Sequence, residues 1–136
     1  MKKNTSKKFL ITETNHIIIN CKVNGTNGRF ILDTGASNSC INLLMVNKFN
    51  LRLKKYKKNA ASATSTINEA YISKNNLFET NNLKKDFEVI VFDMTYINNS
   101  LNEKKIEEVD GIIGGDFLKE LNANIDYEKK IVTLKF

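Results

Sequence analysis

The sequence predicts an all-β domain with one or two short helices. Runs of β-branched and aromatic residues recur along the chain, clusters of Asn and Gly separate them, and only the short segments 43–49 and 117–121 fit helical turns. A chain of 136 residues is most simply one domain, because it can bury a substantial core but is too short for two lobes. A function that needs a second lobe must therefore obtain it from another chain.

The composition is that of an ordinary globular protein. Hydrophobic residues make up 41% of the chain and charged residues 26%, which excludes a disordered or membrane-embedded chain, and no apolar run is long enough to span a bilayer. The net charge of +6 comes from 21 basic and 15 acidic residues, and the basic ones are mostly lysines among asparagines. We interpret them as solubilising surface and do not expect nucleic-acid binding, because no recognisable binding motif accompanies the charge.

The cysteines and the histidine indicate no metal site. Cys21, Cys40 and His16 lack metal-ligand spacing, so we expect neither a metal nor another cofactor. The cysteines are expected to be free, half-buried thiols of a reducing compartment, and a disulfide between them stays open. We expect His16 to be a strand-end residue rather than a general base, because no Ser or Cys motif lies near it. The apolar run Phe9–Ile11 is too short for the core of a signal peptide, which predicts a cytoplasmic protein.

The N-terminal quarter predicts a tail followed by a hairpin. We expect residues 1–12 to be a basic tail, mobile over its first eight residues, and residues 13–136 to be the domain. His16–Val23 is rich in β-branched residues, and the turn residues 24–28 separate it from a second strand, Arg29–Asp33. The two strands are predicted to pair as a hairpin.

The middle of the chain predicts further strands and one long connection. Asn38–Asn42 is a short strand candidate whose last residue suits the N-cap of a helix over 43–49. Strands are also expected at Leu77-Phe78 and over Phe87–Phe92, where a near-continuous apolar run indicates a central strand. Tyr96–Glu108 is polar and charged, and we expect an irregular surface connection there.

The C-terminal residues predict a pair of strands. Ala123–Tyr127 and Ile131–Phe136 are expected to pair through a turn. In a monomer, the apolar second strand would be an exposed sheet edge, which favours association with another chain.

Two motifs carry the chemistry. In the first, Phe30–Ser37, apolar β-formers deliver Asp33 into a turn of small residues, where backbone N–H groups can point at its carboxylate. Such an acid is expected to be partly desolvated yet hydrogen-bonded, a combination that marks functional sites. In the second motif, Asp110–Asp116, two isoleucines precede a pair of glycines and a short helix. Asp116 itself is expected to be an early-helix residue favoured by the helix dipole.

Together, these motifs and the helix that leads to Ile125-Asp126-Tyr127 resemble those of the retropepsin-like aspartic proteases, particularly the bacterial single-domain members, over roughly residues 16–136. The resemblance implies an acid-protease β-barrel, a single lobe completed by homodimerisation, with a peptide or protein substrate. Hydrolysis through an activated water needs two carboxyl groups, and two of them about 3 Å apart share one proton. The chain offers one suitable acid, so a homodimer would supply the second Asp33 across its twofold axis.

The resemblance also implies roles for the residues of the active loop, Asp33–Ser37. Asp33 would be catalytic, and Thr34 would bond across the axis to the partner loop. Gly35 would offer backbone contacts to the substrate. Ala36 and Ser37 are small enough to let the substrate backbone approach.

The second motif is expected to support this loop. Ile112 and Ile113 would line side-chain pockets and pack behind the loop, where Gly114 leaves room. Gly115 stands where many viral relatives have arginine, which removes a residue that braces the loop.

The segment Asn59–Ile72 stands where the family has its flap, a hairpin that closes over the peptide and excludes water. Its tip is expected to consist of five small residues: Ala61, Ser62, Ala63, Thr64 and Ser65. Many relatives carry glycines at this tip, and this segment has none.

The sequence therefore predicts an aspartic-type endopeptidase that hydrolyses peptide bonds with a water activated between two Asp33 carboxylates of a homodimer. The alternative is a non-catalytic dimeric domain of the same fold that binds an extended peptide by strand addition. A nucleic-acid-binding module ranks third.

Overall fold

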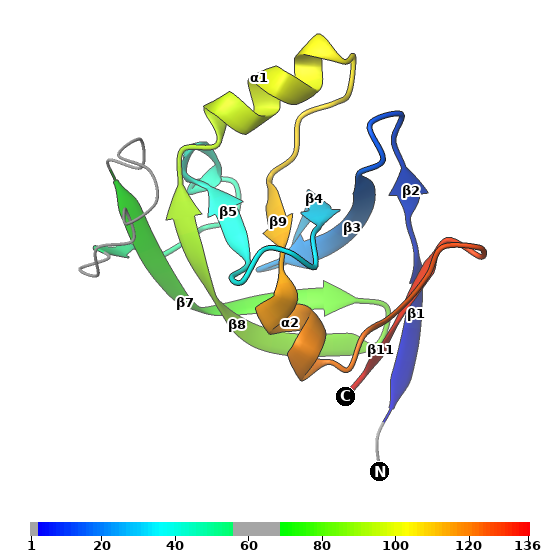
Figure 1. Ribbon diagram of the computed structural model, residues 1–136. Coiled ribbons are helices and arrows are strands. Elements are labelled where there is room, and N and C mark those ends of the chain that lie inside the picture. Colours follow the sequence, from blue (N-terminus) through cyan, green and yellow to red (C-terminus); the bar gives the residue numbers. More distant parts are fainter. Residues whose placement is uncertain (1–2, 56–68) are drawn as a thin grey trace.

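The computed structural model of the chain describes residues 3–55 and 69–136 (Figure 1). Strands dominate these residues, and the helices among them are short. None of these helices is long and apolar enough to cross a membrane. The strands are β1 (Asn4–Lys8), β2 (Leu10–Ile11), β3 (Ile17–Val23), β4 (Thr26–Leu32), β5 (Cys40–Asn42), β6 (Lys54–Lys55), β7 (Ala70–Thr80), β8 (Leu83–Phe92), β9 (Gly111–Ile113), β10 (Asn124–Asp126) and β11 (Ile131–Lys135). The helices are the 3-10 helix η1 (Leu43–Met45), α1 (Thr95–Glu103) and α2 (Gly115–Glu120).

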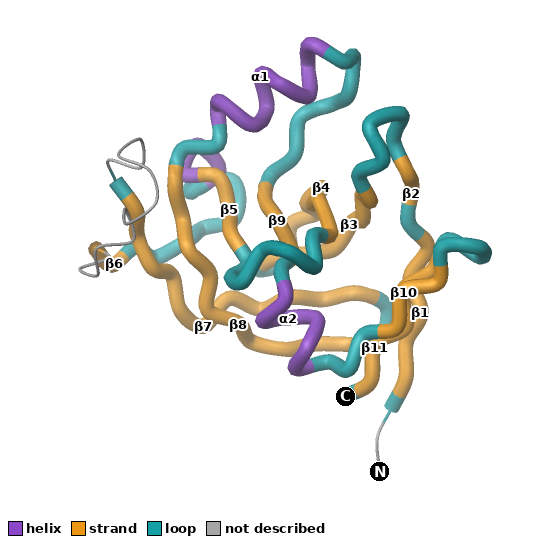
Figure 2. The backbone as a smooth tube through the Cα atoms, in the orientation of Figure 1, coloured by secondary structure: helices purple, strands orange, loops and turns teal. Residues whose placement is uncertain are grey.

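Most of the strands form one curved sheet. Its order within the described residues is β2-β3-β4-β9-β5-β8-β7-β6, and an additional pairing of β3 with β7 joins its two halves. The six strands from β3 round to β7 therefore close into a barrel, which occupies the centre of Figure 2. The predicted all-β class with short helices is confirmed.

The hairpin of β3 and β4 is tighter than predicted. Val23 pairs with Thr26, so the turn consists of Asn24 and Gly25 alone, both at positive φ (51° and 87°). Asn and Gly are the residues that adopt this conformation at least cost, and two such residues give the turn that matches the twist of paired strands. The predicted pairing of the two strands is confirmed.

Strand β4 is buried on both faces, which fixes the position of the residue that follows it. Phe30 and Leu32 pack into the main core of the barrel, whereas Ile31 packs into a second cluster beneath α1. In the main core, Phe117 of α2 lies close to two phenylalanines of the β7–β8 hairpin, at ring-centroid distances of 5.6 Å from Phe78 and 4.4 Å from Phe87. The strand that leads into the first motif therefore runs through the middle of the molecule.

The connection predicted to be irregular contains a helix. In α1, Asn98 and Leu101 are buried, and Ile97 packs against the second cluster. These three positions lie on one face of a helix, a pattern that the many polar residues of the segment obscure. Figure 1 shows α1 at one end of the barrel, above β5 and β9.

Both ends of the described chain also differ from the prediction. Residues 4–8 of the expected mobile tail form β1, which pairs with β11 from Asn4↔Lys135 to Lys8↔Ile131. Strand β11 lies between β1 and β10, and its Val132 and Leu134 are buried, so it is not an exposed edge. The strand finds its partners within the chain, because the alternation of its side chains puts an apolar face on the barrel core. The domain boundary at residue 13 stays a prediction.

The helix predicted over 43–49 is shorter than expected. Only Leu43–Met45 is helical, as one 3-10 turn, and Asn42 caps it by accepting a hydrogen bond from the backbone N–H of Leu44 at 3.2 Å. The same Asn42 oxygen accepts a bond from the backbone N–H of Met94 at 3.1 Å, so this buried residue also ties β5 to the end of β8. The predicted cap is confirmed.

Candidate active site

The active loop begins where β4 leaves the core. The backbone N–H of Asp33 donates to the carbonyl of Ile113 at 2.9 Å, which continues the pairing of β4 with β9 by one residue. The N–H of Gly35 then donates to Asp33 Oδ1 at 2.9 Å, and the N–H of Ala36 donates to the Asp33 carbonyl at 3.2 Å. The turn therefore orients the carboxylate through its own backbone, as the small residues predict.

The two motifs meet although about eighty residues separate them. Strand β9 runs parallel to β4, with Ile31 opposite Ile112 and Leu32 opposite Ile113. At the next position a Cβ on Gly114 would lie 2.6 Å from the Ala36 carbonyl oxygen, so only glycine fits there. Parallel pairing thus places the start of α2 directly against the active loop.

A buried serine joins the loop to this second motif. Ser39, only 1% exposed, donates its Oγ–H to Asp116 Oδ1 at 2.8 Å and its backbone N–H to Asp116 Oδ2 at 3.0 Å. Its Oγ also accepts from the N–H of Gly114 at 2.9 Å, and its carbonyl accepts from the N–H of Ile90 at 3.0 Å. Asp116 lies in the first turn of α2, as predicted, but the sequence does not predict this bracing contact. Its two partners are far apart in sequence, and no local signal joins them.

Ile112 and Ile113 occupy different environments. Ile113 is buried in the main core behind the active loop, whereas Ile112 is half-buried against the cluster beneath α1. Gly115 is half-buried, and its N–H donates to the Ala36 carbonyl at 2.6 Å. In this chain, backbone hydrogen bonds and the Ser39–Asp116 pair hold the loop where an arginine is expected in viral relatives.

The side chain of Asp33 is exposed in the single chain, as are Thr34, Gly35 and Ser37, with Ala36 half-buried. The prediction of a partly desolvated Asp33 is therefore wrong for one chain by itself. Asp33 lies one residue past the buried end of β4, where its side chain is exposed to solvent. The described residues of one chain therefore leave this carboxylate open to water.

Asp110, the first residue of the second motif, binds Arg29 and Lys48 rather than the active loop. Asp110 Oδ2 accepts from the backbone N–H of Arg29 at 2.9 Å and from Lys48 Nζ at 3.0 Å.

His16 directly precedes β3, and its Nδ1 lies 2.6 Å from Thr14 Oγ1. The interpretation of His16 as a strand-end residue is confirmed.

The two cysteines are free thiols, as expected. Cys21 is fully buried rather than half-buried, and burial raises the pKa of its thiol to about 12. Burial has the same effect on Cys40, the first residue of β5, raising its pKa to about 12. Both groups are therefore neutral at physiological pH and are poor nucleophiles.

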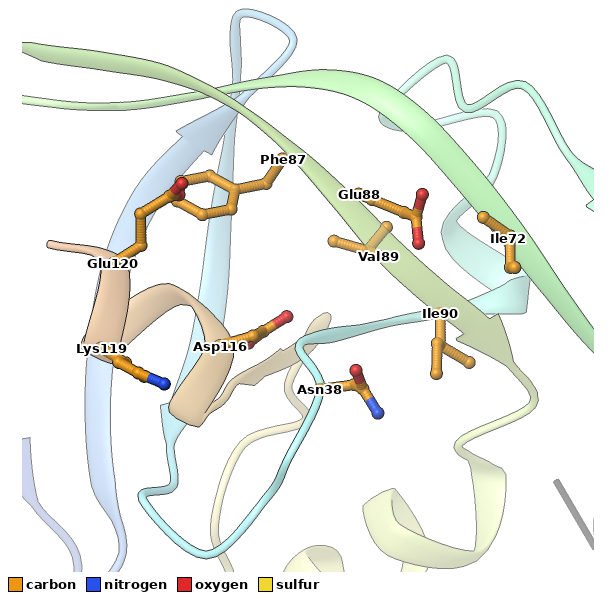
Figure 3. A pocket seen from close by; sticks show the side chains of 9 residues that line it. All are labelled: Asn38, Ile72, Phe87, Glu88, Val89, Ile90, Asp116, Lys119 and Glu120. Atoms are coloured by element: carbon orange, nitrogen blue, oxygen red, sulfur yellow. The ribbon is translucent and has the colours of Figure 1, made fainter.

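A cavity of about 550 Å³ opens next to the active loop (Figure 3). Asn38, the residue after the loop, lines it on one side, and residues of β7, β8 and α2 line the others. The predicted flap tip, Ala61–Ser65, lies outside the described residues. The described parts of the chain thus supply a cavity that adjoins Asn38, the residue after the active loop.

This fold and this loop define a retropepsin-like aspartic protease. A family model described as aspartyl protease matches residues 19–117, and the chain belongs to that family. No protein in a search of curated sequences matches.

Solved structures of proteases share the fold. A retropepsin-like aspartic protease from Rickettsia conorii is 18% identical, with a TM-score of 0.66, and the match covers 100% of this chain and 93% of the other. The EIAV protease in complex with the inhibitor HBY-793 is 19% identical, with a TM-score of 0.60, over 86% of this chain and 98% of the other. The retroviral protease-like domain of Ddi1 from Leishmania major is 17% identical, with a TM-score of 0.60, over 88% and 87%.

Proposed function

We propose that this chain is an aspartic endopeptidase that works as a homodimer, with Asp33 of each subunit forming the catalytic pair. One observation carries the proposal: a single Asp-Thr-Gly loop follows β4, is hydrogen-bonded to the end of β9 and presents an exposed carboxylate. A carboxylate held in a fixed orientation but left exposed is suited to meet a second one across a twofold axis.

In the dimer, the two Asp33 carboxyl groups lie close enough to share one proton. The ionised group takes a proton from water as the water oxygen attacks the peptide carbonyl carbon, while the protonated group donates its proton to the carbonyl oxygen. When the tetrahedral intermediate collapses, that oxygen returns its proton to the carboxylate that donated it. The C–N bond breaks, and the other carboxyl group gives the leaving amine the proton that came from water. Activity should consequently rise and fall with pH as the pair passes through its singly protonated state.

The neighbours of Asp33 position this pair and the substrate. Thr34 bonds to the partner loop, Gly35 contacts the substrate backbone, and the small side chains of Ala36 and Ser37 leave room for it. Ile112 contributes to a substrate pocket, Ile113 supports the loop from the core, and Gly114 allows the close approach. The five flap-tip residues 61–65 would close over the bound peptide. We further propose that the protein acts in the cytoplasm, where its thiols stay reduced.

Replacing Asp33 by asparagine tests the proposal. Asn has the same shape but cannot exchange a proton, so Asp33→Asn should lower kcat/KM on a peptide library about 10²–10⁴-fold. Sedimentation of the variant should match that of the wild type. Asp86→Asn, which changes an exposed acid of β8, is the matched control and should cleave normally.

Two results would contradict the proposal. One is a wild-type protein that cleaves no peptide between acidic and neutral pH, and the other is an Asp33→Asn variant that cleaves as fast as wild type. Peptide binding without cleavage by the wild type would instead support the non-catalytic alternative.

A further inference from the structure

We propose that the cavity next to the active loop is a substrate subsite that takes a lysine or arginine side chain, an inference that rests on the proposed function and specifies its substrate. The cavity combines an apolar floor with an acidic rim, and Asn38, the residue that follows the active loop, lines it. A long side chain with a cationic end matches both the floor and the rim.

The floor of the cavity is apolar and fixed. Four apolar residues line it: Phe87 and Val89, core residues of β8 that are only 8% and 1% exposed, and half-buried Ile72 and Ile90, which are more accessible (Figure 3). The methylene stem of a lysine or arginine packs well on such a surface while its charged end stays near water. A short polar side chain would leave this floor uncovered.

The rim carries negative charge in a chain that is otherwise basic. Three carboxylates line the cavity, Glu88 from β8 and Asp116 and Glu120 from α2, against one ammonium group, that of Lys119. The whole chain has a net charge of +6, so this excess of acid is local. Figure 3 shows the carboxylates of Glu88 and Asp116 on opposite sides of the open space.

Two of these acids are available to a ligand. Glu88 lies 4.0 Å from Lys74 and Glu120 lies 3.9 Å from Lys85, at the long limit for ion pairs. Both pairs are well exposed, and exposed pairs at this distance contribute little to stability. Asp116 differs, because Ser39 and the N–H of Phe117 already occupy its oxygens. We therefore assign recognition of the cation to Glu88 and Glu120.

The position of the cavity agrees with a role in binding substrate. Asn38 directly follows the active loop, and Ile72, near the start of β7, is the last residue of the segment predicted to carry the flap. A peptide extended along the loop projects alternate side chains to opposite sides. One of them, some residues from the cleaved bond, would enter the cavity.

Peptide cleavage measures the preference directly. A set of internally quenched peptides carries lysine, norleucine or glutamate at one position at a time on either side of the cleaved bond. At one position, lysine should exceed norleucine in kcat/KM by about three- to tenfold, and glutamate should be the poorest. The double variant Glu88→Gln/Glu120→Gln should bring the lysine-to-norleucine ratio close to one. The change should come from slower cleavage of the lysine peptide, because only that peptide has a cation for the two carboxylates to bind.

The controls separate this inference from the proposed function. Glu128→Gln, an exposed acid in the turn before β11, should leave the lysine-to-norleucine ratio unchanged. The affinities of the same peptides, fluorescently labelled, for the Asp33→Asn variant test the subsite without cleavage. They should show the same preference for lysine. If the wild type cleaves peptides but no position prefers lysine, or if the double variant keeps the preference, the subsite is wrong while the protease proposal stands. If nothing is cleaved, the protease proposal fails and the binding ratio alone decides on the subsite.

Discussion

At the scale of single residues, Ser39 holds the candidate site together. Its hydroxyl accepts a hydrogen bond from Gly114 and donates one to Asp116, and its side chain is almost fully buried. Each of these bonds joins the strand that follows the active loop to the junction of β9 and α2. Removing the hydroxyl would leave the buried N–H of Gly114 without this partner and Asp116 Oδ1 with only the N–H of Phe117. An unpaired buried group costs more than a hydrogen bond contributes.

We predict that Ser39→Ala lowers the free energy of unfolding by about 1–3 kcal/mol, measured by urea denaturation. Ser39→Thr keeps the hydroxyl and should recover most of this loss. Ser100→Ala, on the exposed face of α1, is the control and should change stability by less than about 0.5 kcal/mol. Equal stability of Ser39→Ala and wild type would show that the loop does not depend on this contact.

At the scale of secondary-structure elements, α1 is held by a pair of hydrogen bonds that its sequence does not reveal. Asn98 Nδ2 donates to the carbonyl of Val109 at 3.1 Å, and its Oδ1 accepts from the N–H of the same residue at 2.8 Å. The side chain thus pairs with the backbone as a strand would. It fixes the chain just before β9, and through β9 the second motif.

Neighbouring asparagines of α1 provide a test of this contact. Asn98→Ala should lower the free energy of unfolding by about 1–3 kcal/mol, because it leaves both buried backbone groups of Val109 unpaired. Asn99→Ala changes an exposed residue of the same helix and should have little effect or stabilise slightly, since Ala is the better helix former. Chemical denaturation of both variants, followed by circular dichroism, compares them. A smaller loss for Asn98→Ala than for Asn99→Ala would contradict this role.

Elements with a local signal could be predicted from the sequence, and those that depend on distant partners could not. Asn24-Gly25 marks the turn of β3 and β4, and the glycines after Ile113 mark the start of α2. By contrast, β1 is a lysine-rich strand that exists because β11 pairs with it, and α1 depends on a contact with Val109. Likewise, the sequence predicts Asp33 as the reactive acid but not the Ser39–Asp116 pair that supports its loop.

At the scale of the whole molecule, one chain presents half of the proposed catalytic pair. An exposed C-terminal strand, which the sequence suggests as a reason for association, does not exist, because β11 is the middle strand of its sheet. The remaining reason is chemical, because peptide hydrolysis by this mechanism needs two carboxyl groups. In the described residues, Asp33 is the exposed acid of the one Asp-Thr-Gly loop.

We predict that activity per chain falls on dilution, because a dissociated subunit keeps its fold but loses the second Asp33. Sedimentation velocity over the same concentrations should show dimer giving way to monomer. A tandem protein, in which a flexible linker joins two copies of the chain, should keep its activity at dilutions where the single chain loses it. Full activity of the monomer would contradict the proposal of a homodimer.

The pairing of β1 with β11 also bears on how this protein comes to be folded during synthesis. Among the described strands, β1 is synthesised first, yet its only paired neighbour among them is the last, β11. The hairpins β3–β4 and β7–β8 can form as soon as they are made, whereas the pairing of β1 has to wait until β11 has been synthesised. Until then β1 is a strand without its partner, and the charges of Lys7 and Lys8 disfavour its association with other strands.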